Sequence, residues 1–134
     1  MTEGAYIIVV DDEPEVQRML KRVLELEGCA VSIVGSSREA LDLLEMLTPD
    51  LVILNIAMSD SDSLHVLDLI RQSTGVHVIM LTAHSEVNTM QEVQSLGADD
   101  YISKPLHTGE FLNRVRKQLE DGPDSISHNG VEDT

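Results

Sequence analysis

The stretch DLVILNIAMSDSDS, residues 50–63, joins an apolar run to a polar loop. Four apolar residues follow one another over 51–54, which predicts a strand that is covered on both faces. The serines and aspartates after them are typical of a loop. Asn55 stands between the two, where the strand ends. Because α/β folds often place their ligands beyond the ends of their strands, Asn55 is the first candidate functional residue.

Four more short apolar runs repeat this pattern along the chain. They are YIIVV (6–10), AVSIV (30–34), HVIML (77–81) and DYIS (100–103), and they are rich in β-branched residues. Such runs predict strands that are buried on both faces. A helical pattern follows each of the five strands. Since parallel strands need helical crossovers, the alternation predicts an α/β domain with a doubly wound five-stranded parallel sheet and five helices.

Proline, glycine and helix-capping residues mark the ends of the expected helices. The first opens at Pro14 and ends at Gly28, and the second begins with a capping box of Ser36 and Glu39. The third helix has a weaker pattern, an apolar stripe of Leu64, Leu67 and Ile70. The fourth is expected to run from a cap at Ser85 to Gly97. The fifth is expected to begin with a cap at Thr108 and to carry the apolar residues Phe111, Leu112, Val115 and Leu119.

Composition and charge limit the class of protein. The chain has 134 residues, of which 42% are hydrophobic, and this is enough for the core of one domain. Its net charge of −15 argues against nucleic-acid binding through this domain and against adhesion to an acidic membrane. The start of the sequence does not have the pattern of a signal peptide, and no apolar run is long enough for a membrane span. We therefore expect a cytoplasmic domain whose partners are proteins or cations.

The end of the sequence differs from the rest. Residues 1–120 carry the strand and helix patterns, whereas residues 121–134 are acidic, contain Gly and Pro, and show no apolar periodicity. We interpret 1–120 as one domain and 121–134 as a flexible tail or linker. A linker would lead to an output domain beyond residue 134, and a plain disordered end explains the composition equally well.

Polar residues follow the other strands as well. Asp11 and Asp12 follow the first strand, Thr82 the fourth and Lys104 the fifth. The carboxyl ends of parallel strands meet at one edge of a sheet, so these side chains are expected to converge with Asn55 on one cleft. Carboxylate and amide oxygens suit Mg²⁺, while a lysine and a hydroxyl suit a phosphoryl group.

Each of these residues also has a purely structural explanation. Asp11 and Asp12 can favour the positive N-terminus of the first helix. Lys104 can be a surface lysine before a turn, and Thr82 can bond to local backbone. The residues alone leave both explanations open.

Four segments together make the sequence resemble the receiver domains of two-component response regulators, the family of the single-domain chemotaxis regulator. The segments are IIVVDDEPEVQRML, PDLVILNIAM, VIMLTAHS and GADDYISKPL, and they follow four of the predicted strands in the right order. The resemblance covers roughly residues 5–120. It implies a flavodoxin-like sheet with strand order 2-1-3-4-5, and a histidine kinase or another signalling protein as partner.

The resemblance also implies roles for individual residues. Asn55 falls on the phosphoacceptor position, and Thr82 and Lys104 on the partners of the phosphoryl group. Thr82 and Tyr101 match the switch residues, which in the family couple the site to a docking face. The residues implied as ligands of Mg²⁺ are Asp11, Asp12, Asn55 and the backbone carbonyl of Ala57. Those expected on the docking face are Gln91, Gln94, Tyr101, Arg114 and Gln118.

Asn55 departs from the family pattern in a way that matters for chemistry. An amide has no anionic oxygen to attack a phosphorylated histidine, so the chain as written is expected not to be an enzyme and not to accept a phosphoryl group. Any Mg²⁺ is expected to bind weakly. Asp60 and Asp62 are interpreted as loop and cap residues, not as substitute acceptors.

Three functional hypotheses remain. The first is a natural receiver that acts through protein–protein interaction, and it is favoured because Ser59 and Ser63 also depart from the usual proline and glycine. The second is an ordinary Mg²⁺-dependent receiver in which Asn55 is an engineered replacement. The third is a flavodoxin-like cofactor binder, which is disfavoured because DDEPE presents repelling carboxylates where a phosphate would bind.

Overall fold

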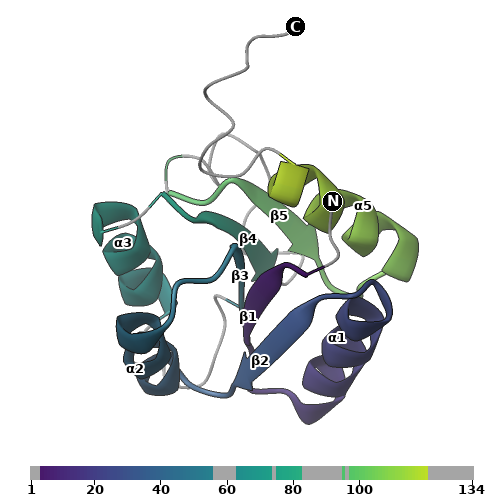
Figure 1. Ribbon diagram of the computed structural model, residues 1–134, viewed down its shortest axis with the longest axis horizontal. Helices are drawn as coiled ribbons and strands as arrows, with labels where there is room; N and C mark the ends of the chain where they lie inside the picture. Colours follow the sequence, from purple (N-terminus) through teal and green to yellow (C-terminus); the bar gives the residue numbers. More distant parts are fainter. Residues whose placement is uncertain (1–3, 56–62, 74, 83–94, 96, 121–134) are drawn as a thin grey trace, which may run out of the picture.

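The computed structural model describes residues 4–55, 63–73, 75–82, 95 and 97–120, and it shows one parallel sheet between two layers of helices (Figure 1). The strands are β1 (Tyr6–Val10), β2 (Ala30–Val34), β3 (Leu51–Asn55), β4 (His77–Thr82) and β5 (Asp100–Ser103). All neighbours pair in parallel, in the order β2-β1-β3-β4-β5. The predicted fold class and strand order are confirmed. β3 and β4 each extend one residue further than predicted, to Asn55 and Thr82.

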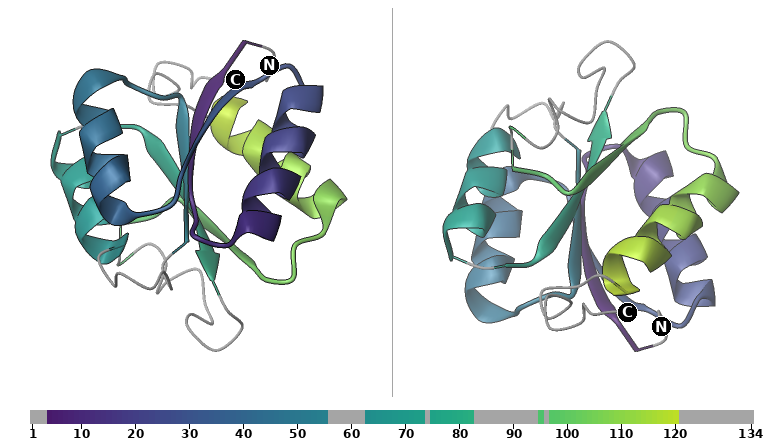
Figure 2. Two further views of the ribbon diagram at one scale, coloured as in Figure 1. Left: turned by 90° about the horizontal axis from the view of Figure 1, so that it is seen from below. Right: turned by 90° about the horizontal axis from the view of Figure 1, so that it is seen from above.

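Four helices are described: α1 (Pro14–Leu26), α2 (Ser37–Met46), α3 (Ser63–Ser73) and α5 (Thr108–Glu120). α1 and α5 cover one face of the sheet, and α2 and α3 cover the other (Figure 2). The expected fourth helix, from Ser85 to Gly97, lies outside the described residues except for Ser95 and Gly97, so the expected total of five helices stays a prediction. Residues 121–134 also lie outside them.

Local signals in the sequence explain where two of these helices are bounded. One half of the expected capping box of α2 is present, because Ser36 Oγ accepts a hydrogen bond from Glu39 N at 3.1 Å. The Glu39 carboxylate reaches back to Gly35 N at 2.8 Å. α1 begins at Pro14, and Gly28 follows its end with φ 91°, a backbone conformation that favours glycine.

The core consists of two apolar layers, one on each face of the sheet. Successive residues of a strand point to opposite faces. Ile7 and Val9 of β1 accordingly pack with Leu20 of α1 and Phe111 of α5. The intervening residues of the strands pack under α2 and α3, in a cluster that includes Ile8, Val10, Ala40, Leu67 and Ile70. Because of this alternation, the position of a residue just beyond the end of a strand indicates the face of the sheet on which its side chain lies.

No described helix has both the length and the apolar character needed to cross a membrane.

Candidate functional site

Cross-strand register brings the polar residues at the strand ends to one edge of the sheet. Val10 pairs with Leu54, so Asp11 follows β1 at the level where Asn55 ends β3. Asn55 pairs with Leu81, and Thr82 pairs with Ser103, which precedes Lys104. The predicted convergence of these residues at the carboxyl edge therefore follows from the sheet itself.

Asp11 is fully buried and directs the turn from β1 into α1. Its Oδ1 accepts a hydrogen bond from Glu13 N at 2.9 Å, a local contact that aspartate favours in turns. Its backbone N donates to Val34 O at 3.1 Å, and its backbone O accepts from Gln17 Nε2. Oδ2 has no hydrogen-bond partner among the described residues. This oxygen lies 3.2 Å from Lys104 Nζ, so it is already paired with a cation although it accepts no hydrogen bond.

Asn55 is the last residue of β3 and has only 3% of its surface exposed. By the alternation of the strand it continues the side of Leu51 and Ile53, which lies under α1 and α5. Asp11 continues the same side after Ile7 and Val9. The amide is therefore built into the buried edge beside Asp11, and it is not a loop residue in solvent.

Thr82 ends β4 and is fully buried. Its backbone O accepts a hydrogen bond from Lys104 N at 2.9 Å, which ties β4 to the start of the loop after β5. Its Oγ1 is buried and has no hydrogen-bond partner in the described part of the chain. A buried hydroxyl normally forms a hydrogen bond, so Thr82 Oγ1 can still bind a polar group at this edge.

Lys104 is the cation of this edge. Its Nζ lies 3.2 Å from Asp11 Oδ2 and 2.5 Å from Glu13 Oε1, and its side chain is 22% exposed. Partial burial lowers the pKa of Lys104, but the hydrogen bond to Glu13 and the charge of Asp11 raise it by more. The net pKa lies above the ordinary lysine value of 10.5, so the ammonium stays charged near neutral pH.

Glu13 is the residue that sequence reasoning missed. The motif DDEPE shows it as a third acid next to Asp11 and Asp12, with nothing in the local pattern to mark it as a partner of a lysine far along the chain. The signal was the unbalanced lysine at the same sheet edge. With Glu13 included, two carboxylates contact one ammonium, so the net charge of this contact is negative and favours a further cation over an anion.

Two residues expected at the docking face are placed by a network at the β5–α5 edge. Tyr101 is partly buried and packs against the cluster under α2 and α3. Arg114 Nη1 donates to Tyr101 O at 3.0 Å and pairs with Asp100 Oδ1. Arg114 is therefore held by its own domain as well as being partly accessible.

The expectation that Gln118 faces the docking surface is wrong. Gln118 is 6% exposed, and its Oε1 lies 2.6 Å from His77 Nδ1. The α5 periodicity turns it inward, on the same side of the helix as Phe111 and Val115. Gln91, Gln94, Ala57, Ser59, Asp60 and Asp62 lie outside the described residues, as does the side chain of Ser63.

The described donors fit Mg²⁺ by their chemistry. Asp11 has a buried carboxylate oxygen whose partner is the ammonium of Lys104, Asp12 follows Asp11 directly, and Asn55 has an amide oxygen. Hard oxygen ligands of this kind are those that Mg²⁺ prefers. In the described part of the chain no group of three or more His, Cys, Asp and Glu residues is arranged to hold a metal, so any site here must draw on Asn55, backbone or water.

Comparisons with known proteins agree on one family. The model of the response regulator receiver domain matches residues 7–116. The DNA-binding response regulator MtrA of Mycolicibacterium smegmatis is 37% identical over 119 residues, which are 88% of this chain and 52% of that protein. The transcriptional regulatory protein CpxR of Escherichia coli is 39% identical over 114 residues, 84% of this chain and 48% of that protein. The chain thus spans about half the length of these curated relatives.

Solved structures show the same similarity. A response regulator receiver protein from Burkholderia phymatum superposes with a TM-score of 0.78 at 31% identity, covering 87% of this chain and 95% of that one. A CheY-like receiver domain protein from Methanospirillum hungatei gives a TM-score of 0.80 at 26% identity, covering 89% and 96%. The similarity therefore extends over nearly the whole of both solved chains.

Proposed function

Because this chain belongs to the response regulator receiver domain family, we propose that it is a two-component signalling module that acts through protein–protein contacts without an aspartyl phosphate. The observation that carries this proposal is the buried amide of Asn55 at the carboxyl end of β3, beside Asp11. Phosphotransfer from a histidine needs an anionic nucleophile, and an amide oxygen is neutral. The sheet edge therefore keeps the polar residues around position 55 but has no carboxylate there to accept a phosphoryl group.

The metal site of the family is proposed to persist in a weakened form. Asp11, Asp12 and Asn55 would hold Mg²⁺, together with the backbone carbonyl that the family expects from Ala57. When bound, the ion would neutralise charge on a phosphoryl group. Affinity is expected to be low because one of the three side chains is neutral.

Lys104 and Thr82 are proposed to retain their family roles toward a phosphoryl group or another anion at this edge. The unsatisfied hydroxyl of Thr82 supports this role, since it has a donor to offer. Lys104 supports it less directly, because its ammonium is already paired with Asp11 and Glu13. Tyr101 is proposed as the switch aromatic that links this edge to the β5–α5 surface.

The partners are proposed from the family and from charge. We propose a histidine kinase or another signalling protein as the partner of this domain in the cytoplasm. MtrA is named as DNA-binding, and this chain matches about half of it. An output domain beyond residue 134 is therefore proposed for the whole protein, whereas the net charge of −15 argues against DNA contact through this domain.

The test compares partner binding in the chain and in Asn55→Asp. Each protein is titrated against an immobilised histidine kinase domain, with and without a small phosphodonor and Mg²⁺. We expect the affinity of the chain to be the same in both conditions, and that of Asn55→Asp to change. A phosphodonor-dependent affinity of the unaltered chain would contradict the proposal. Sequencing codon 55 of the source gene separates a natural asparagine from an engineered one.

A further inference from the structure

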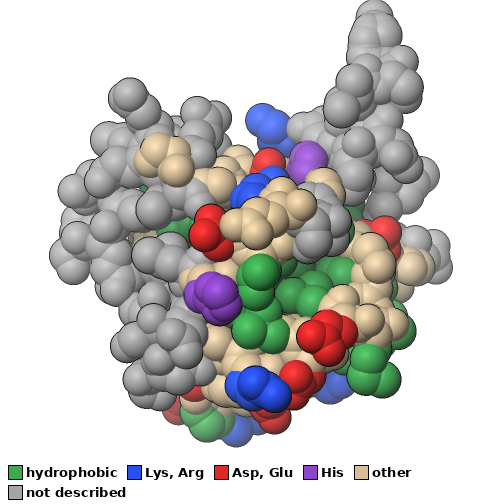
Figure 3. Space-filling model, turned by 90° about the vertical axis from the view of Figure 1, so that its left-hand side faces the viewer, with side chains coloured by type: hydrophobic (Ala, Val, Ile, Leu, Met, Phe, Trp, Pro, Cys, Tyr) green, Lys and Arg blue, Asp and Glu red, His purple; other side chains and the backbone are tan. Residues whose placement is uncertain are grey.

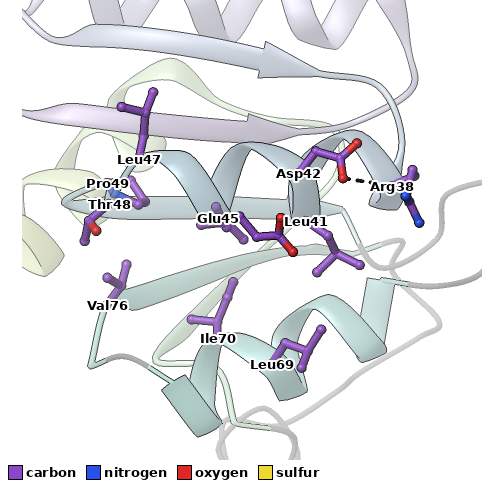
Figure 4. Close-up of a pocket in the computed structure, with 11 residues that line it drawn as sticks. Arg38, Leu41, Asp42, Glu45, Leu47, Thr48, Pro49, Leu69, Ile70 and Val76 are labelled. Carbon is purple, nitrogen blue, oxygen red and sulfur yellow. Dashed lines mark ion pairs between the residues drawn. The ribbon is translucent and has the colours of Figure 1, made fainter.

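A groove of about 370 Å³ lies between α2 and α3 and runs along α2, from Arg38 in its first turn to Pro49 before β3. Its apolar lining comprises Leu41, Leu44, Leu47, Leu69, Ile70 and Val76, and Arg38, Asp42, Glu45 and Thr48 line it as well. In Figure 4, Leu41 of α2 points toward α3, and Ile70 of α3 points toward α2. Leu47 and Val76 precede β3 and β4, so the groove opens near the amino ends of these strands.

Apolar surface continues from the groove onto the outside of the domain. Leu47 is 47% exposed and Met46, beside it at the end of α2, is 79% exposed. Among the described residues only Leu26, on the other face of the sheet, is a comparable exposed large hydrophobic side chain. Figure 3 shows hydrophobic side chains gathered in a hollow on this side of the molecule, with acidic, basic and histidine side chains around them. An apolar patch with a polar rim is typical of a binding surface.

The rim of the groove carries one uncompensated negative charge. Arg38 Nε lies 3.4 Å from Asp42 Oδ1, so these two charges neutralise each other. Glu45 points toward the groove in Figure 4 and forms no ion pair with any described residue. The groove therefore combines an apolar floor with an acidic edge.

We propose that this groove binds an amphipathic helix of a partner protein, with apolar residues on one face and a lysine or arginine flanking them. Two helices side by side leave a groove into which the side chains of a third helix pack. The cation of the partner would pair with Glu45. The residues that line the groove include none of the candidate site, so this surface does not depend on the chemistry at Asn55.

Charge argues against two other occupants. A second copy of the chain brings a net charge of −15 toward the same charge, which opposes self-association. The segment 121–134 of the chain itself carries four acidic residues against no lysine or arginine, and its only large aliphatic residues are Ile126 and Val131. Neither matches an apolar floor with an acidic rim.

The test uses a synthetic helical peptide with leucines on one face and lysines beside them, titrated into isotopically labelled protein. We expect saturable binding, with amide shifts gathered at Leu41, Leu44 and Leu69. Reversing the rim charge in Glu45→Lys should lower the affinity for the peptide about threefold, as expected for one exposed ion pair. Leu47→Asp should weaken it as well, because the variant places a charge on the apolar surface.

The matched control is Glu15→Lys, which makes the same change of charge in the first turn of α1 on the opposite face of the sheet. It should leave peptide affinity unchanged. Equal weakening by Glu15→Lys and Glu45→Lys would show general charge attraction and overturn the proposal. Equal binding of a peptide with glutamates in place of lysines, or amide shifts at another face, would also overturn it. Shifts of the groove residues that depend on protein concentration alone would make a second copy the occupant and overturn it too.

Discussion

Lys104 Nζ forms an ion pair with Glu13 Oε1 at 2.5 Å, although the two residues are 91 positions apart in the sequence. The pair joins the turn after β1 to the loop after β5. Asp11 approaches the same ammonium at 3.2 Å. The charge of Lys104, which is proposed to face a phosphoryl group, is therefore neutralised by two carboxylates at the turn after β1, without any charge at position 55.

Glu13→Gln is predicted to lower the pKa of Lys104. The hydrogen bond to Glu13 is the largest of the effects that raise this pKa, so losing its charge leaves Asp11 alone against the burial of the ammonium. Nuclear magnetic resonance titration of the lysine side-chain carbons measures the change. Glu15→Gln, a loss of the same charge two residues further along α1, serves as control and should leave the titration of Lys104 in place.

The same pair predicts how stability depends on pH. The pKa of Lys104 is raised in the folded state, so its contribution to the free energy of unfolding is complete below about pH 10.5 and is lost as pH rises through the folded pKa. Glu13 is 57% exposed, which limits the pair to about 0.5 kcal/mol. Urea unfolding of the chain and of Glu13→Gln should differ by this amount near pH 8 and converge at high pH. A difference that persists there would implicate another contact.

Mg²⁺ is predicted to bind the chain more weakly than it binds Asn55→Asp, by roughly tenfold, because the variant adds one negative charge beside Asp11. Calorimetric titration of both proteins gives the two dissociation constants. Asp11→Asn in either background should weaken binding further, because it removes the charge of a buried carboxylate. Equal affinities of the chain and Asn55→Asp would mean that position 55 does not face the metal.

Gln118→Ala is predicted to destabilise the domain by about 1 kcal/mol. The substitution removes the partner of His77 Nδ1 at a buried position, and a lost side-chain hydrogen bond costs this much on average. Thermal unfolding measures the effect. Asn113→Ala, on the exposed side of the same helix, is the comparison and should change stability less. If both variants unfold alike, the contact between His77 and Gln118 contributes nothing measurable.

The strand pattern could be predicted because apolar runs and punctuation residues are local signals. The run 51–54 and the cap of Ser36 on Glu39 N both depend on neighbours in the sequence, and both were found, although the Glu39 carboxylate accepts from Gly35 N instead of Ser36 N. The strand ends were less clear. Asn55 and Thr82 extend their strands because the sheet register pairs them with Leu81 and Ser103, and this pairing is not a local property.

The candidate site could be predicted only as a set of positions. Register explains why Asp11, Asn55 and Thr82 reach the same edge, but the partner of Lys104 depended on how the first turn folds back. Glu13 enters the site because Asp11 Oδ1 accepts from its backbone N and sets the turn. Gln118 was misplaced for a similar reason, since a polar residue on a helix was assumed to face solvent although His77 offered it a buried partner.

Asn55 is proposed to occupy the phosphoacceptor position. The chain as written should gain no phosphoryl adduct from a small phosphodonor with Mg²⁺, because the amide of Asn55 has no anionic oxygen to attack phosphorus. Asn55→Asp should gain one, since it restores that oxygen at nearly the same side-chain size, at the sheet edge that carries the buried Asp11 and Thr82 and the partly exposed Lys104. Intact-mass spectrometry reads both proteins directly. In the Asn55→Asp background, Glu13→Gln should change the rate of adduct formation and Glu15→Gln should not, because Lys104 is paired with Glu13 and not with Glu15. A phosphoryl adduct on the unaltered chain would show that another residue accepts the group, and it would contradict this prediction. An Asn55→Asp protein that stays unlabelled would show that more than the nucleophile has been lost from this edge.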